Sequence, residues 1–261
     1  MTESGGAVKA VPAAALIVVR PAVPAPEILL LKRSARARFM PNAHVFPGGA
    51  VDALDQGAGL EALCAGLDEA AASRALGKAA QGLGYFVAAV RETFEECGLL
   101  YAYVRGATLA SQADADTLRQ ALGAQITRGQ GGAAGQDGAA RQSLGDTGFA
   151  AACAGQGWRL ATDRLSFFGH WITPPRMPRR FDTRFFLARA PEAQSAALVS
   201  EEMQQVCWLS AREALARQVR RELLLMTPTQ ALLEELAAFA DLGALLEYAR
   251  APRLIEPITP P

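Results

Sequence analysis

The chain of 261 residues is long enough to bury a sizeable core, and its 26 basic and 26 acidic residues cancel to a net charge of zero. This balance excludes a generally basic surface of the kind that binds nucleic acid, and no apolar run reaches the roughly 18–20 residues that span a bilayer. The 4 cysteines are scattered without the spacing of a metal site or a disulfide framework.

The chain begins with a polar, glycine-containing stretch at residues 1–10, which lacks the apolar core of a secretory signal. Because the last residues carry no peroxisomal address either, a cytoplasmic location is expected. Two short apolar runs, 14–19 and 27–31, then flank a proline-rich loop and predict a pair of strands.

A glycine turn follows, at Pro47-Gly48-Gly49, where the absence of a side chain lets the backbone approach a phosphate or a metal closely. Arginines precede this turn, and their guanidinium groups suit phosphate, so they are candidates for substrate contact, with a solvated surface as the alternative. These arginines are Arg33, Arg36 and Arg38.

Residues 86–97 are predicted to form a helix with two unlike faces. One face is apolar at helical spacing and is expected to pack on the core, through Val87, Val90, Phe94 and Cys97. On the other face, Glu92 lies one turn before Glu95 and Glu96, so the three carboxylates are neighbours that repel one another unless a cation neutralises them. Such oxygen ligands suit Mg²⁺ or Mn²⁺, although a solvated acidic face is the plainer interpretation. Gly98 is placed to end the helix in a left-handed conformation.

The rest of the chain alternates between helical and extended patterns. Helices are expected over 113–122 and 147–155, on either side of a loop at 129–138 that is rich in Gly, Ala and Gln. Strands are expected over 165–172, 183–187 and 204–209, and Ser210 is placed to cap a helix that starts at Ala211. Two further helices are expected over 232–239 and 242–249. Strands interleaved with helices predict an α/β sandwich with the acidic helix packed on a mixed sheet.

The glycine turn and the acidic helix together resemble the two ends of the Nudix box. Gly49 and Asp55 match its first half, with Asp where the family has Glu, and the run from Arg91 to Leu99 matches its second half. These halves follow one another closely in the standard box, whereas 35 residues (91 − 55 − 1) separate Asp55 from Arg91 here. An interrupted box is a feature of the Nudix branch that includes the peroxisomal coenzyme A diphosphatase of mammals and bacterial relatives.

The resemblance implies a Nudix-type α/β/α sandwich with a mixed sheet, formed by one domain over 1–261. Extra helical insertions are expected at about 56–84 and 106–160, with a helical C-terminal extension at about 211–250. The first insertion is Ala- and Leu-rich over 60–76, which predicts a small helix of its own. Such an insertion is tolerated when its ends lie close together, because loop-closure entropy grows slowly with length.

The resemblance also implies a metal-dependent diphosphatase and roles for individual residues. The expected ligands of Mg²⁺ or Mn²⁺ are Glu92, Glu95 and Glu96. Arg91 is expected to orient this acidic cluster by bridging to Glu95. Glu202 is a candidate base for the attacking water, as are the helix glutamates. The expected substrate contacts are Arg33, Arg36, Arg38, Gly48, Gly49 and Arg180.

The substrate class that the interrupted box favours is coenzyme A or acyl-coenzyme A. Its diphosphate would be cleaved to phosphopantetheine, or the acyl form, and adenosine 3′,5′-bisphosphate. ADP-ribose or a dinucleotide is the alternative substrate, and a non-catalytic nucleotide sensor is the alternative function. No nucleic-acid or membrane partner is expected, and the apolar C-terminal helices are compatible with a homodimer.

Overall fold

The structure is a computed structural model that describes residues 8–37, 39–57, 59–129 and 148–260, with the backbone alone for 124–129. Arg38 and residues 130–138 of the predicted glycine-rich loop lie outside the described residues.

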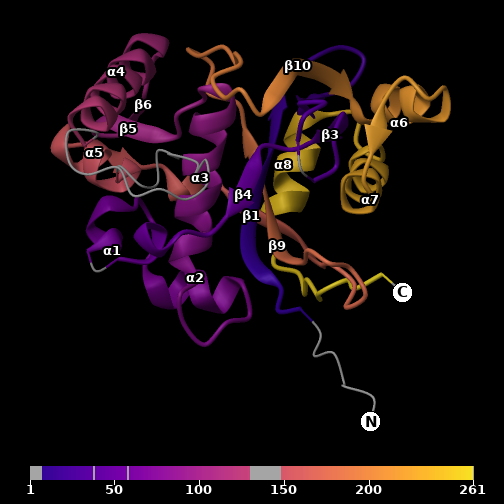
Figure 1. The fold of residues 1–261 in the computed structure, drawn as a ribbon, viewed down its shortest axis with the longest axis horizontal. Coiled ribbons are helices and arrows are strands. Elements are labelled where there is room, and N and C mark those ends of the chain that lie inside the picture. Colours follow the sequence, from indigo (N-terminus) through magenta and orange to yellow (C-terminus); the bar gives the residue numbers. More distant parts are fainter. Residues whose placement is uncertain (1–7, 38, 58, 130–147, 261) are drawn as a thin grey trace.

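A mixed sheet forms the centre of the fold (Figure 1). Its strand order is β11-β3-β2-β1-β9-β8, with β4 paired to β1 and β10 paired to β2. The strands are β1 (Val11–Arg20), β2 (Glu27–Arg33), β3 (Ala43–Val45), β4 (Gly48–Ala50), β8 (Ser166–Ile172), β9 (Phe181–Arg189), β10 (Met203–Ser210) and β11 (Leu224–Leu225). β1 pairs with β2, as predicted; the two strands are antiparallel, whereas β1 and β9 are parallel.

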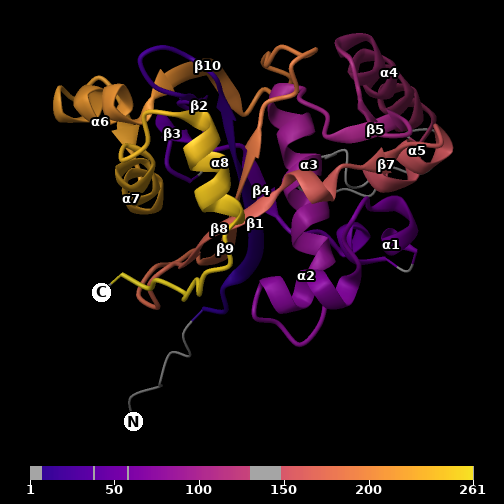
Figure 2. The ribbon, with the colours of Figure 1, turned by 180° about the vertical axis from the view of Figure 1, so that it is seen from behind.

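Helices cover both faces of this sheet (Figures 1 and 2). Residues of α3 (Leu83–Cys97) share one apolar core with Leu16 and Val18 of β1. Ile17 and Val19 point to the other face, where they share a second core with α6 (Ala211–Val219), α7 (Thr227–Leu236) and α8 (Leu242–Arg250). Because strand side chains alternate, β1 is buried on both faces and must be apolar throughout its middle. The predicted α/β/α sandwich is therefore confirmed.

A side lobe extends the α3 face and is built largely from the predicted insertions (Figure 1). A small sheet of order β6-β5-β7 carries it, together with short helical segments. The lobe contains η1 (Ala53–Gln56), α1 (Leu60–Leu63), α2 (Glu69–Ala75), β5 (Ala102–Arg105), β6 (Thr108–Leu109), α4 (Gln112–Gly129), α5 (Phe149–Gly155), β7 (Arg159–Leu160) and η2 (Thr162–Arg164).

Several helix predictions differ from the structure, including α4, which continues to Gly129 rather than ending at 122. The first insertion forms two short helices rather than one, because the chain turns after Leu63 and Asp68 starts a new helix by accepting a hydrogen bond from the Ala71 amide at 2.6 Å. α7 begins at Thr227, five residues before the predicted start at 232, with a proline in its first turn where proline is tolerated. α3 itself also begins slightly early, at Leu83, and ends as predicted with Gly98 at φ 75°.

The first insertion supplies a cap for α3. The Glu69 carboxylate of α2 accepts hydrogen bonds from the backbone amides of Gly82 at 2.8 Å and Leu83 at 3.1 Å, at the start of α3. These amides have no partner inside the helix, and a negative charge is favourable at a helix N-terminus. The segment that interrupts the sequence motif therefore packs against α3 and holds its first turn.

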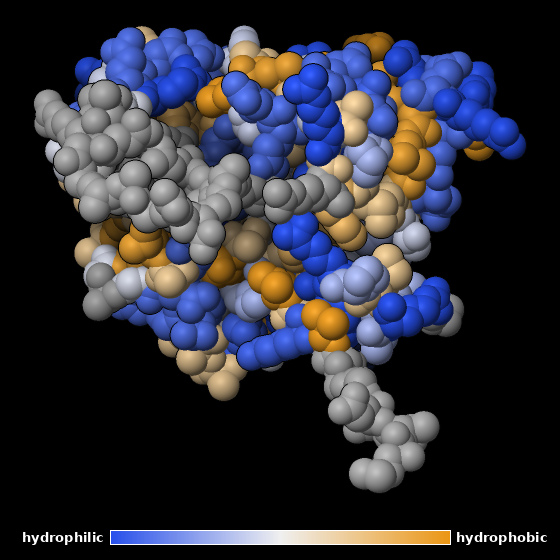
Figure 3. All heavy atoms as spheres, viewed as in Figure 1, coloured by the Kyte–Doolittle hydropathy of each residue, from blue (hydrophilic) through white to orange (hydrophobic). Residues whose placement is uncertain are grey.

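The surface view in Figure 3 shows hydrophilic side chains gathered over α4 and α6, at the two upper corners of this face. Among the described residues, no helix is both long enough and apolar enough to cross a lipid bilayer.

A partly buried ionic cluster joins β8 and β9 beneath α3. Asp182 accepts a hydrogen bond from Arg184 at 2.7 Å and contacts Nε2 of His170 at 2.6 Å, while the Arg184 guanidinium lies over the ring of Tyr85 at 4.6 Å. Burial by itself would raise the pKa of Asp182, but the hydrogen bonds from His170 and Arg184 outweigh it and lower the pKa to about 2.

This cluster predicts an acid-sensitive contribution to stability. The folded pKa of Asp182 lies below the unfolded value of about 3.9, so its ionised form stabilises the fold above about pH 4 and this contribution is lost as the pH falls toward 2. Asp182→Asn is expected to lower the free energy of unfolding by about 2 kcal/mol at pH 7, with the difference shrinking as the pH falls below about 4. Urea unfolding of both proteins across this range measures it, and a difference independent of pH would contradict the assignment.

Candidate functional site

Gly48 and Gly49 of the predicted glycine turn form the short strand β4, and this segment, for which the name glycine turn is kept, lies directly against the acidic helix. β4 pairs with β1, with Gly49 opposite Ala14, and this brings the turn under α3. A Cβ atom on Gly48 would lie 2.5 Å from the Ala14 carbonyl oxygen, and one on Gly49 would lie 2.3 Å from Oε1 of Glu92. Gly48 therefore requires glycine, because a side chain there would meet the backbone of β1, whereas a side chain on Gly49 would displace the Glu92 carboxylate.

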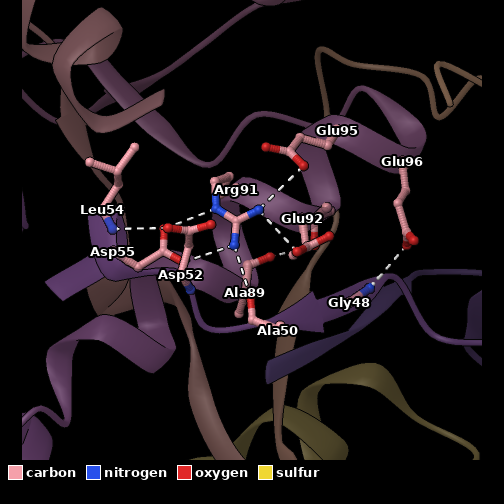
Figure 4. Close-up of polar contacts among 11 residues, drawn as sticks. Gly48, Ala50, Asp52, Leu54, Asp55, Ala89, Arg91, Glu92, Glu95 and Glu96 are labelled. Atoms are coloured by element: carbon pink, nitrogen blue, oxygen red, sulfur yellow. Dashed lines mark hydrogen bonds and ion pairs between the residues drawn. The ribbon is translucent and has the colours of Figure 1, made fainter. Parts of the chain in front are cut away.

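Arg91 links the two halves of the interrupted motif (Figure 4). Its Nε donates to Oδ1 of Asp55 at 2.9 Å and one terminal nitrogen donates to Oδ2 at 2.8 Å, which makes a bidentate pair. The same terminal nitrogen donates to the carbonyl of Ala50 at 2.9 Å. Both side chains of the pair are about 3% exposed. Asp55 also accepts from the Asp52 amide at 2.8 Å, which fixes its own position.

The remaining terminal nitrogen of Arg91 faces two of the three helix glutamates. It lies 2.9 Å from Oε1 of Glu92 and 3.3 Å from Oε2 of Glu95, so the predicted i,i+4 bridge to Glu95 is present. Although burial alone would lower the pKa of Arg91, these carboxylates and Asp55 raise it, so the guanidinium remains charged. Arg91 therefore contacts the carboxylates of both Glu92 and Glu95.

Glu96 points away from Arg91 and toward the glycine turn (Figure 4). Its Oε2 accepts a hydrogen bond from the Gly48 amide at 3.0 Å. Burial and repulsion by Glu92 raise the pKa of Glu96 well above its usual value. Burial likewise raises the pKa of Glu95 to about 7. Its Oε1 is buried without a hydrogen-bond partner among the described residues.

Glu202 and Arg33 reach the same place from distant parts of the sequence. The charges of both residues act on Glu96, with Arg33 favouring its ionised form and Glu202 disfavouring it. Oε2 of Glu202 lies 4.0 Å from the Arg33 guanidinium, and Nε of Arg33 donates to the Phe39 carbonyl at 3.1 Å. The structure thus brings these two predicted site residues to the acidic cluster.

Two other arginines from the predicted set lie elsewhere. Arg36 is exposed in the loop after β2. Arg180 donates to the backbone carbonyls of Thr173 at 2.9 Å and Val8 at 2.6 Å, so it ties the loop between β8 and β9 to the N-terminal segment. These contacts give Arg180 a structural role.

The donor set fits a hard divalent cation in its chemistry, but the side chains do not converge. All the candidate ligands are carboxylates, the donors that Mg²⁺ and Mn²⁺ prefer, and the orphaned Oε1 of Glu95 offers an open ligand position. As the described residues lie, however, no group of three His, Cys, Asp or Glu side chains is close enough to hold a metal ion. Glu92 and Glu95 accept hydrogen bonds from the Arg91 side chain, whereas Glu96 accepts one from the Gly48 amide. The convergence of three carboxylates expected from helical spacing is therefore not present.

The sequence did not identify the partner of Arg91 across the insertion. Asp55 matched a motif position, but helical spacing pointed only to Glu95 as a partner. The capping position of Asp55, three residues after Asp52 at the start of η1, was the local signal available.

The comparisons with known proteins agree with this geometry. No family model matches the chain. It is 29% identical to nudix hydrolase 7 of Caenorhabditis elegans over 72% of this chain and 48% of that protein. It is also 29% identical to the acyl-coenzyme A diphosphatase NUDT19 of Gallus gallus over 85% of this chain and 64% of that protein. The human protein of the same name is 29% identical over 85% of this chain and 63% of its own length.

The chain thus spans between 48% and 64% of the length of these curated relatives. Among solved structures, a NUDIX hydrolase from Alicyclobacillus acidocaldarius matches with a TM-score of 0.66 and 26% identity, over 92% of this chain and 96% of that one. The chain therefore has the fold of the Nudix hydrolases and resembles them in sequence over most of its length, including two proteins named acyl-coenzyme A diphosphatases.

Proposed function

We propose that this protein hydrolyses the diphosphate bond of a nucleoside diphosphate derivative. The observation that carries the proposal is the partly buried acidic cluster of α3, which Arg91, fixed by its buried pair with Asp55, holds directly against Gly48 and Gly49. Diphosphate cleavage requires neutralisation of charge on the phosphoryl oxygens, a positioned water and a stabilised leaving group. The carboxylates of α3, the backbone of Gly48 and Gly49 beside them, and Arg91 are groups of the kinds that this reaction uses.

The residues that would hold Mg²⁺ or Mn²⁺ are Glu92 and Glu96, with Glu95 beside them. When bound, the cation neutralises charge on the phosphoryl oxygens of the substrate. Arg91 holds Glu92 and Glu95 in place through its two hydrogen bonds. The absence of side chains at Gly48 and Gly49 lets this backbone lie directly against the helix carboxylates.

Glu202 and Arg33 would act on the substrate side of the cluster. Glu202 immediately precedes β10, where it would accept a proton from the attacking water as general base. Arg33 lies beside it, and its guanidinium is suited to contact a phosphate oxygen. The two side chains come from adjacent strands, because Met203 pairs with Arg33, so their relative position is set by the sheet.

The substrate class we propose is coenzyme A or acyl-coenzyme A. Two relatives at 29% identity are named acyl-coenzyme A diphosphatases, and the interrupted box resembles that branch. The products would be phosphopantetheine, or its acyl form, and adenosine 3′,5′-bisphosphate.

A substrate panel with Mg²⁺ tests the proposal. Coenzyme A, an acyl-coenzyme A, ADP-ribose and NADH are incubated with the full chain, and products are separated by chromatography. We expect release of adenosine 3′,5′-bisphosphate from the coenzyme A substrates. Turnover of ADP-ribose or NADH with intact coenzyme A would contradict the substrate class. Tight nucleotide binding without hydrolysis of any compound would favour a nucleotide sensor.

Gly49→Ala is expected to lower kcat by about tenfold to a hundredfold, because misplacing a catalytic group by about 1 Å is enough for such a loss. The added methyl group would overlap the Glu92 carboxylate and move it. Gly57→Ala is the matched control, since a methyl group there meets nothing within 4 Å. Initial rates with Mg²⁺ measure both variants, and equal rates for Gly49→Ala and wild type would contradict the role of the turn.

A further inference from the structure

The connection between β9 and β10 crosses the C-terminal end of α3. We call its residues 190–199 the strap. The Ala197 amide donates to the Cys97 carbonyl at 3.0 Å, and the Val199 amide donates to the Glu96 carbonyl at 3.3 Å. Carbonyls in the last turn of a helix have no partner within the helix, so the strap completes this end of α3. Its backbone is thereby bonded directly to a residue of the acidic cluster.

The side chain of Gln194 fastens the strap to the side lobe. Its Oε1 accepts from the Leu100 amide at 2.8 Å. Its Nε2 donates to the Leu100 carbonyl at 2.9 Å and to the Ala110 carbonyl at 2.7 Å. The amide group thus satisfies three backbone groups at once, through its acceptor oxygen and both of its donor hydrogens.

A second glutamine supports the same attachment from α4. Oε1 of the Gln112 side chain accepts a hydrogen bond from the Ser195 backbone amide at 3.0 Å. The backbone amide of Gln112 donates to the Ala193 carbonyl at 3.0 Å. The strap is therefore held on both sides of Gln194.

Glu202 lies three residues after the end of the strap, and its backbone is hydrogen-bonded to Ser34, directly after β2. The Glu202 carbonyl accepts from the Ser34 amide at 2.7 Å, and the next residue, Met203, begins the pairing of β10 with β2. Glu202 therefore lies between an attachment to the side lobe through Gln194 and an attachment to the sheet through Ser34. Its charge reaches Glu96, the residue on which the strap also rests.

We propose that Gln194 is a positioning residue that fixes the strap so that Glu202 faces the acidic cluster. The inference rests on the proposed function, because it needs Glu202 to act on the substrate. The three hydrogen bonds of the Gln194 side chain all go to backbone groups. Glu at this position would keep the acceptor for Leu100 but would set a carboxylate against two carbonyl oxygens.

A double-mutant cycle on the full chain tests the proposal. kcat and KM for coenzyme A are measured for wild type, Gln194→Ala, Glu202→Gln and the double variant. We expect each single change to lower kcat by about tenfold to a hundredfold with a smaller change in KM, as found for residues that orient catalytic groups. The double variant is expected to be no slower than Glu202→Gln alone, because Gln194 acts only by positioning the Glu202 carboxylate, which is already absent in that variant.

Two further variants separate positioning from loss of stability. Gln194→Glu keeps the size of the side chain and should lower kcat as Gln194→Ala does, so it serves if the alanine variant does not fold. Gln218→Ala is the matched control, since it removes the hydrogen bond from Gln218 to Gln230 at 2.8 Å between α6 and α7 and should leave kcat unchanged.

Each outcome decides between the two claims. Rate losses that multiply in the double variant, an unchanged kcat in the folded Gln194 variants, or an unchanged kcat in Glu202→Gln would overturn the inference. Absence of hydrolysis by the wild-type protein would instead overturn the proposed function.

Discussion

Glu96→Gln is expected to lower kcat with Mg²⁺ at least about a hundredfold while leaving the fold intact. Substitution of groups that merely support a metal ligand already costs about 10–100-fold, so loss of a ligand charge should cost more. The amide oxygen of Gln can still accept the hydrogen bond from the Gly48 amide, which preserves the contact between α3 and the turn. Initial rates over a range of Mg²⁺ concentrations measure the effect.

The same substitution should not lower the stability of the metal-free protein. Burial and repulsion by Glu92 raise the pKa of Glu96, so its charged form is unfavourable in the folded state and a neutral amide removes that cost. Thermal unfolding in the presence of a chelator is expected to give a Tm equal to or above that of wild type. The control is Glu234→Gln, an exposed position on α7 that should change neither quantity. Wild-type rates for Glu96→Gln would contradict the assignment of the cluster.

Arg91→Met is expected to lower the free energy of unfolding by about 3–5 kcal/mol, because it leaves Asp55 buried without its bidentate partner. It also removes the positive charge that faces Glu92 and Glu95. For a chain of this size, about 2–4 °C of Tm corresponds to each kcal/mol, so the Tm should fall by about 6–20 °C. Differential scanning calorimetry or urea unfolding measures the change.

An exposed ion pair provides the comparison for Arg91. Arg217 and Glu213 on α6 are 41% and 42% exposed and lie 2.7 Å apart. Arg217→Ala should cost no more than about 1 kcal/mol, since solvent screens such pairs. A loss of similar size for Arg91→Met and Arg217→Ala would show that the Arg91–Asp55 pair does not hold the two halves of the motif together.

The parts of the fold that local sequence determines were predicted well. The apolar face of α3, its termination at Gly98 and the Ser210 cap of α6 depend on residues within a few positions of one another. The strand pair at the start of the chain was equally visible, because both strands are continuous apolar runs. The layered arrangement followed from the alternation of strands and helices together with the resemblance to Nudix hydrolases.

The contacts that complete the site depend on residues far apart in the sequence. Asp55 and Arg91 meet across the first insertion, and Gln194 reaches Leu100 across 94 positions. The periodicity of apolar residues along the sequence does not predict such contacts, because they form only when the sheet and the side lobe pack together.

Helical spacing also gave an incomplete account of the glutamates. Glu95 and Glu96 are adjacent in sequence, so they leave the helix in directions about 100° apart. In the structure the Glu95 carboxylate contacts Arg91, whereas the Glu96 carboxylate accepts a hydrogen bond from the Gly48 amide. Their position on one face of the helix therefore predicted that the carboxylates are neighbours, but it did not predict the direction in which each side chain points.

Manganese binding tests the central claim, that the acidic face of α3 is a cation site, without relying on the choice of substrate. Mn²⁺ is titrated into wild type and Glu96→Gln at constant pH, and free Mn²⁺ is followed by electron paramagnetic resonance. We expect saturable binding by wild type and a large loss of affinity in Glu96→Gln, with Glu234→Gln binding as wild type does. Equal Mn²⁺ affinity in wild type and in correctly folded Glu96→Gln would contradict the account.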